Sequence, residues 1–191
     1  MNQVILDLPK GSLNTKGRGN TQEVFLNAGY DIQGYEPGEE SATRLGITND
    51  PEINLFLARP QSMPVELSRR LADLAIVGED WIMEENDPGI RKIGDLDYGR
   101  VRIVAAIPEA EPYQTLDAFF RGEAESGKPI LCFTEYLNLT RQWFMQNEAY
   151  KELFGDKRPF VQVRGLTDGE NKHVQIINSD GVIRRCEYYT V

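Results

Sequence analysis

The stretch INLFLARPQSMPVELSRRLADLAIVGED, residues 53–80, decides the fold class. Residues 53–58 are a short apolar run of strand formers. The run closes at Arg59-Pro60, because the residue before a proline is pushed out of the helical region. Residues 63–71 have helical spacing, and residues 74–77 form a second compact apolar strand. Continuous apolar runs in a strand, helix, strand order are typical of a parallel sheet covered on both faces, so the sequence predicts an α/β protein.

The same kind of pattern continues on both sides of this stretch. Further strands are predicted over residues 4–8, 101–107, 130–133, 160–164 and 174–177, helices over 22–28 and 139–148, and a polar, looser segment over 108–127. The strand series restarts after Gly99, which predicts a second α/β lobe with a hinge near Tyr98-Gly99. We therefore expect a first lobe over residues 1–99, a second over 100–182 and an atypical tail over 183–191.

Composition and charge exclude several function classes. The chain has 191 residues, of which 40% are hydrophobic and 27% charged, as in ordinary globular proteins. A net charge of −9 argues against nucleic acid as a partner, because binding to a phosphate backbone relies on a basic surface. No run approaches the roughly 18–20 uncharged apolar residues of a membrane helix, and the N-terminus lacks the basic region of a secretory signal. Two cysteines and one histidine match no metal spacing, so we expect a cytoplasmic protein without a metal site of its own.

Two polar segments of the first lobe follow predicted strands, where α/β proteins bind ligands. Lys10 can hold a phosphate and Gly11 lets the backbone approach it, but a plain turn with a solvated lysine fits the spacing better. Arg18, in the segment NTKGRGN (residues 14–20), belongs either to a flexible loop or to a second anion contact. Arg59 can fork onto a phosphate, or it can pair with a neighbouring acid at the surface.

The segment ADLAIVGED, residues 72–80, carries acids on both sides of a predicted strand. Asp80 either caps the following helix, which is the more common role, or faces a ligand. The fragment is typical of two-lobed ligand-binding folds of the periplasmic-binding-protein kind, in which the glycine at the strand tip, here Gly78, leaves room for ligand. If Lys10, Arg59 and Asp80 all follow parallel strands, they should line a common cleft.

The second lobe has an equivalent loop in Glu135-Tyr136-Leu137-Asn138-Leu139-Thr140-Arg141. Asn138 is a natural N-cap for the helix that follows. Tyr136 and Arg141 can contact a nucleotide; the alternative is that the loop supplies only the helix cap and a core-edge tyrosine.

Six segments in this order resemble ATP phosphoribosyltransferases. They are LPKGSL (8–13), AGYDI (28–32), DPEINLFLARPQSMP (50–64), ADLAIVGEDW (72–81), LDYGRVRIVAA (96–106) and EYLNLTRQWF (135–144). The similarity covers roughly residues 3 to 182. It implies two α/β lobes with mainly parallel sheets, in the periplasmic-binding-protein-like (type II) architecture, with ATP and phosphoribosyl pyrophosphate meeting in a cleft.

The resemblance also implies site residues. The suggested catalytic residues are Lys10 and Arg59; the suggested substrate-binding residues are Gly11, Ser12, Arg18, Asp73, Gly78, Asp80, Tyr136, Asn138, Thr140 and Arg141. The chain departs from the family pattern at three places before its tail. Ser12 stands where many members have arginine. Residues 14–19 look inserted, and Arg18 among them is a candidate replacement for that arginine. Leu137 stands where proline is usual.

The implied reaction joins adenine N1 of ATP to C1 of the ribose of phosphoribosyl pyrophosphate, the first step of histidine biosynthesis, with Mg²⁺ carried by the pyrophosphate substrate. The implied assembly is a homo-oligomer or a complex with a regulatory subunit. The tail IRRCEYYTV (183–191) lacks the glycine-rich phosphate loop of the family, so we expect this chain to bind ATP weakly without turnover. The alternative from another class is a non-catalytic two-lobed module that binds a nucleotide or small anion.

Overall fold

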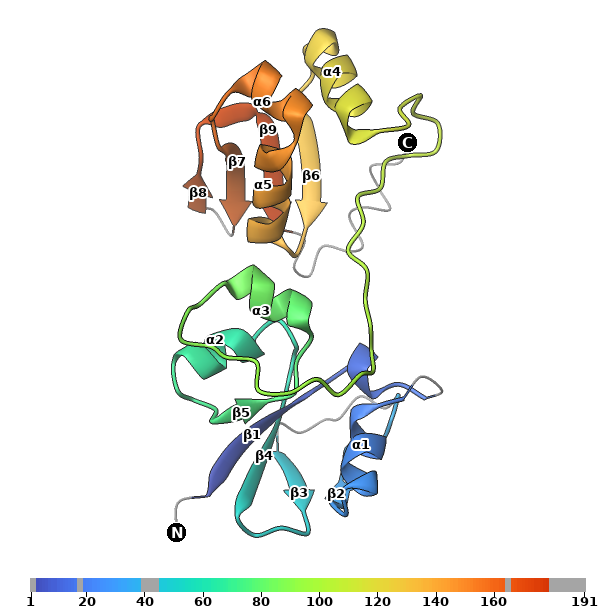
Figure 1. The fold of residues 1–191 in the computed structure, drawn as a ribbon, viewed down its shortest axis with the longest axis vertical. Helices are drawn as coiled ribbons and strands as arrows, with labels where there is room; N and C mark the ends of the chain where they lie inside the picture. Colours follow the sequence, from blue (N-terminus) through green and yellow to red (C-terminus); the bar gives the residue numbers. More distant parts are fainter. Residues whose placement is uncertain (1–2, 17–18, 39–44, 164–165, 179–191) are drawn as a thin grey trace. The chain divides into compact units, whose positions relative to one another are not determined.

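The computed structural model describes residues 3–16, 19–38, 45–163 and 166–178 and divides the chain into two compact units, Met1–Ile103 and Val104–Val191. Figure 1 labels the helices and strands of both. No helix among these residues is long and apolar enough to cross a membrane.

The first unit contains one mixed sheet. Its elements are β1 (Val4–Pro9), η1 (Ser12–Asn14), α1 (Thr21–Asn27), β2 (Ile32–Gln33), β3 (Leu45–Thr48), β4 (Ile53–Ala58), α2 (Met63–Ser68), β5 (Leu74–Ala75) and α3 (Glu79–Glu85). The strand order is β2-β3-β4-β1-β5, with β1 parallel to β4 and β5, and β3 antiparallel to β2 and β4. The prediction of a mainly parallel sheet is therefore only partly right here. A short turn joins β3 to β4, and so short a connection makes antiparallel neighbours.

The two faces of this sheet differ, because successive side chains of a strand alternate between them. Leu6 and Leu8 of β1 lie with Leu55 and Leu57 of β4 in a buried cluster, against which Phe25 of α1 packs. The residues between them in the sequence point to the opposite face, and there β1 places a buried carboxylate, Asp7, which is 1% exposed.

The second unit is built on three parallel strands. Its elements are α4 (Leu116–Ser126), β6 (Ile130–Thr134), α5 (Leu137–Gln146), α6 (Glu148–Phe154), β7 (Pro159–Val163), β8 (Leu166–Asp168) and β9 (Asn171–Asn178). The order is β6-β9-β7-β8, in which β6, β9 and β7 are parallel and β8 is antiparallel to β7. The core is aromatic: the ring of Phe120 lies edge-on to Phe144 at 5.2 Å and to Tyr150 at 5.6 Å.

Three predictions about elements of this half of the chain differ from the structure. Residues 101–107 form no strand, and Val101 and Val104 are 61% and 69% exposed, because an apolar run becomes a strand only where another strand pairs with it. The segment expected to be looser contains α4, which begins at a cap: the Thr115 hydroxyl accepts a hydrogen bond from the Ala118 N–H at 3.1 Å. The helix predicted over 139–148 is two helices, α5 and α6.

Candidate active site

The predicted ligand loops of the first unit leave one edge of its sheet. β1 runs parallel to β4, with Pro9 opposite Ala58, and β5 runs parallel on the other side of β1. Lys10 and Arg59 follow the first two strands, and residues 76–80 follow the third. In parallel sheets, ligands bind outside the carboxyl ends of the strands, which is this edge.

The turn after β1 requires glycine at position 11. Gly11 has φ 87° and ψ −131°, a backbone conformation that residues with side chains rarely adopt. Its carbonyl accepts the N–H of Asn14 at 2.9 Å, which closes the short helix η1. Lys10 is half-buried, whereas Gly11 and Ser12 are exposed, so the backbone of the turn is open at the surface. Arg18, the suggested replacement for the family's arginine, lies outside the described residues.

Arg59 stands at the corner between β4 and α2. Its carbonyl accepts hydrogen bonds from the N–H of Ser62 at 2.9 Å and from the Ser62 hydroxyl at 3.0 Å. These bonds fix the backbone of the corner, and the Arg59 side chain is exposed. The arginine is therefore available to an anion at the same edge as Lys10.

Asp80 lies in the first turn of α3, but the residue that caps this helix is Gly78. Of the two roles that the sequence leaves open for Asp80, the structure therefore excludes the helix cap. A Cβ at Gly78 would come within 2.1 Å of Asp80 Oδ1, so the glycine leaves room for the Asp80 carboxylate. Glycine at this position thus has a local packing reason in addition to the suggested one of leaving room for a ligand.

Asp73 lies at the opposite, amino edge of the sheet. It precedes β5, and its Oδ2 accepts the backbone N–H of Ile5, near the start of β1, at 2.9 Å. Its own N–H donates to the Ile5 carbonyl at 2.9 Å. These bonds join the starts of β1 and β5. Asp73 therefore lies at the edge of the sheet opposite to the edge where Lys10 and Arg59 leave it.

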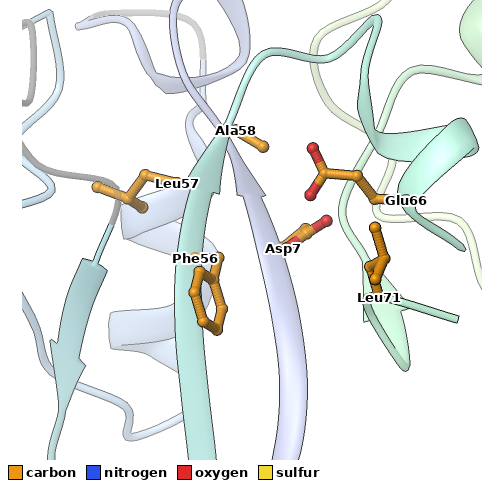
Figure 2. Close-up of a pocket in the computed structure, with 6 residues that line it drawn as sticks. All are labelled: Asp7, Phe56, Leu57, Ala58, Glu66 and Leu71. Carbon is orange, nitrogen blue, oxygen red and sulfur yellow. The ribbon is translucent and has the colours of Figure 1, made fainter.

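A hollow of about 220 Å³ lies on the face of the sheet opposite the apolar cluster. Its lining comprises Asp7, Phe56, Leu57, Ala58, Glu66 and Leu71. Figure 2 shows the carboxylates of Asp7, from β1, and Glu66, from α2, both directed into it. The sequence patterns did not predict this hollow, although Asp7, an acid within an otherwise apolar strand, was a visible signal for it.

In the second unit the candidate loop joins β6 to α5. Tyr136 caps α5 and its N–H donates to the Thr134 hydroxyl at 3.0 Å. Asn138 lies inside the first turn, so the prediction that it caps the helix is wrong. The Thr140 hydroxyl donates to the Thr134 hydroxyl at 3.4 Å, which ties the start of the helix to the end of the strand.

Arg141 is held by an acid, Asp168, that no sequence pattern indicated. Its Nη2 lies 2.9 Å from Oδ2 of Asp168, and Arg158 Nη2 lies 3.7 Å from the other oxygen of the same carboxylate. The two guanidinium groups, that of Arg158 first, hold the pKa of Asp168 below its usual value. Two guanidinium groups therefore share one carboxylate.

No protein-built metal site is found in the part of the chain that the structure describes. No three side chains of His, Cys, Asp or Glu come together there as a group able to hold a metal ion. Magnesium is commonly held by one or two carboxylates together with substrate phosphates, so a substrate-borne ion needs no such group.

Comparison with known proteins identifies the family. The sequence profile of ATP phosphoribosyltransferase matches residues 59–183. The chain belongs to the ATP phosphoribosyltransferase family. An ATP phosphoribosyltransferase of Chlorobaculum parvum is 32% identical over 151 residues, which is 76% of this chain and 45% of that protein. One from Desulforudis audaxviator is 33% identical over 143 residues, or 72% of this chain and 43% of that protein. One from Haloarcula marismortui is 29% identical over 162 residues, or 78% and 51%.

The resemblance seen in the sequence is thus confirmed. The chain spans about half the length of the curated ATP phosphoribosyltransferases that it matches. This member of the family has an α/β fold with two sheets. One is a mixed five-stranded sheet, and the other has three parallel strands and one antiparallel strand.

Proposed function

We propose that this chain acts in ATP phosphoribosyl transfer, the reaction that its family name describes. Adenine N1 of ATP would displace pyrophosphate from C1 of the ribose of phosphoribosyl pyrophosphate, giving phosphoribosyl-ATP as the first step of histidine biosynthesis. The observation that carries the proposal is the placement of Lys10 and Arg59 at one edge of a parallel strand pair in a member of this family. Two cations at this edge suit a leaving pyrophosphate.

The proposed roles follow from the chemistry of the reaction. Adenine N1 has its own lone pair, so catalysis needs positioning and charge neutralisation rather than a strong base. Lys10 and Arg59 neutralise the departing pyrophosphate, and Mg²⁺ arrives bound to that substrate. The proposed substrate contacts are Gly11, Ser12, Arg18, Gly78 and Asp80 in the first unit, and Tyr136, Asn138, Thr140 and Arg141 in the second. Asp73 is left out of this set, because its carboxylate joins strands at the other edge.

The proposal extends to architecture and setting. The two units correspond to the lobes of a periplasmic-binding-protein-like (type II) fold, with the first lobe over residues 1–99 and the second over 100–182. The tail, 183–191, lies outside the described residues. We place the protein in the cytoplasm, as a homo-oligomer or in a complex with a regulatory subunit, with ATP and phosphoribosyl pyrophosphate as its small-molecule partners.

The test combines binding with turnover. ATP and inorganic pyrophosphate are titrated separately into the 191-residue chain by calorimetry, and pyrophosphate release from ATP, phosphoribosyl pyrophosphate and Mg²⁺ is then followed. Steady release that Lys10→Ala and Arg59→Ala each reduce at least tenfold supports the transferase. ATP binding without release agrees with the expectation of binding without turnover and with the alternative of a nucleotide-binding module, and it contradicts the transfer activity proposed for this chain. If the chain binds neither ATP nor pyrophosphate, both the transferase and the nucleotide-binding module are contradicted.

A further inference from the structure

A group of buried polar side chains surrounds the turn that carries Lys10. Asn14, Thr21 and Tyr35 are 5%, 0% and 3% exposed, and they come from three separate segments of the first unit. Buried polar groups are costly unless they are hydrogen-bonded, so their partners show what this arrangement holds in place. We call these three residues the turn frame.

Tyr35 fixes the peptide group from which Lys10 begins. Its hydroxyl donates to the Pro9 carbonyl at 2.5 Å, and the Lys10 N–H donates to the Ala58 carbonyl at 2.8 Å. The Pro9 carbonyl and the Lys10 N–H belong to the same planar peptide group. Since both of its polar atoms are bonded, one by Tyr35 and one by β4, this group has a fixed orientation and so does the Cα of Lys10.

Asn14 connects the far end of the turn to the segment that carries Tyr35. Its side-chain N–H donates to the Tyr35 backbone carbonyl at 3.1 Å. The backbone carbonyl of Asn14 accepts the N–H of Gly38 at 2.8 Å. Its Oδ1 accepts the N–H of Gln22, in the first turn of α1, at 3.2 Å. One side chain therefore ties the turn to two neighbouring segments.

Thr21 completes the frame. Its hydroxyl donates to the Leu13 carbonyl at 3.0 Å and lies 2.6 Å from the hydroxyl of Tyr98, which is therefore the donor of that pair. Burial raises the pKa values of both Tyr35 and Tyr98. Both hydroxyls thus remain protonated at neutral pH and stay available as donors.

We infer that Tyr35 is a positioning residue that holds the Lys10–Gly11–Ser12 turn in the conformation that binds the pyrophosphate group of the substrate. The inference rests on the proposed function for its ligand, and on the hydrogen bonds of Tyr35 and the turn for its mechanics. Tyr35 itself does not touch the anion, since its hydroxyl is committed to the Pro9 carbonyl. It acts through the backbone of Lys10.

The test uses Tyr35→Phe, which removes one hydroxyl and keeps the buried ring. Inorganic pyrophosphate is titrated into the wild-type chain, Tyr35→Phe, Lys10→Ala and the double variant. Tyr35→Phe should weaken binding by about 3- to 10-fold, the effect of one lost hydrogen bond. In the Lys10→Ala background the further loss should be smaller, because the Lys10 side chain is then absent and only the backbone of the turn remains for Tyr35 to position. Tyr30→Phe, a tyrosine of the same unit whose ring lies 5.9 Å from that of Phe25, is the matched control and should bind as wild type does.

A second measurement needs no ligand. Amide hydrogen exchange is compared at the N–H groups of Lys10 and Asn14, which are bonded to Ala58 and Gly11, and at the strand amides of β4. Tyr35→Phe should speed exchange at the turn several-fold and leave the strand unchanged. Unchanged exchange at the turn, or equal weakening of pyrophosphate binding with and without Lys10, would overturn the inference. If the wild-type chain binds no pyrophosphate, the proposed function fails, and the exchange rates alone decide whether Tyr35 holds the turn.

Discussion

In the first unit the turn that carries Lys10 is held by buried hydrogen bonds, whereas in the second unit Arg141 is held by an ion pair with Asp168. The groups of the turn frame are at most 5% exposed. The side chains of Arg141 and Asp168 are 20% and 54% exposed. Buried bonds resist salt and pH but tie the site to the stability of the fold. A partly exposed pair is weaker and depends on conditions, so it can change without unfolding the protein.

The largest expected effect lies in the core on which the second site rests. Phe120 is fully buried and its ring contacts those of Phe144 and Tyr150. Phe120→Ala should lower the free energy of unfolding by about 3–5 kcal/mol, because it removes buried apolar surface and leaves a cavity. Urea denaturation measures the loss. Leu131→Ala, at a residue that is 51% exposed, should lower the free energy of unfolding by well under half the loss seen in Phe120→Ala.

A loss at Phe120 no greater than that at Leu131 would show that the aromatic cluster does not support the second unit. The second site could then no longer be compared with the first as a site held on a stable core, because the loop that carries Arg141 would lack a rigid support.

The next effect concerns the backbone of the first site. Gly11→Ala places a side chain at φ 87°, which costs about 1–2 kcal/mol. We expect this loss in the free energy of unfolding, together with weaker pyrophosphate binding. Gly94→Ala is the matched control, because nothing lies within 4 Å of a Cβ there and Gly94 is not at positive φ. Equal stability of the two variants would mean that the turn is not held in the conformation described.

A third prediction compares the two faces of the first sheet. Asp7 is 1% exposed, and the carboxylate of Glu66 is directed into the same hollow. Asp7→Asn keeps the shape and replaces the buried carboxyl group by a neutral amide, so it should raise the free energy of unfolding by about 1 kcal/mol at pH 7. Chemical denaturation at pH 7 measures the change. A lower stability would show that the contacts of the Asp7 carboxyl group outweigh the cost of its burial. Asp73→Asn, at the edge of the same sheet, should instead destabilise, since its Oδ2 accepts a backbone N–H.

The sequence allows the local part of this structure to be predicted. The strand over residues 53–58 matches β4 at both ends, because its apolar run and the Arg59-Pro60 stop are both local signals. Residues 101–107 have an equally apolar run but no strand, because pairing depends on another segment of the chain. An apolar pattern therefore predicts the tendency of a segment to form a strand, but it does not show whether another strand of the chain pairs with it.

The candidate site divides in the same way. Parallel strands imply that Lys10 and Arg59 leave one edge of the sheet, and this follows from local patterns and the fold class. The bond from Tyr35 to Pro9 spans 26 residues and the pair of Arg141 with Asp168 spans 27. No spacing rule connects residues so far apart in the sequence, so these contacts required the structure.

The smallest expected effect tests the ion pair of the second site. Asp168→Asn removes the charge that Arg141 and Arg158 share, and because the carboxylate is half exposed only a small loss of stability is expected. The pKa of Asp168 is lowered in the folded state, so its contribution is present above the unfolded pKa of about 4 and is lost as pH falls through the lower, folded value. The difference in stability between wild type and variant should therefore be present at pH 6 and narrow below about pH 4, and 1 M salt should reduce it at pH 6. Asp156→Asn, at an exposed acid of the same unit, provides the baseline. A difference that does not respond to pH or salt would mean that Asp168 stabilises the second unit by hydrogen bonding and not by charge, and that the two sites are held in the same way after all.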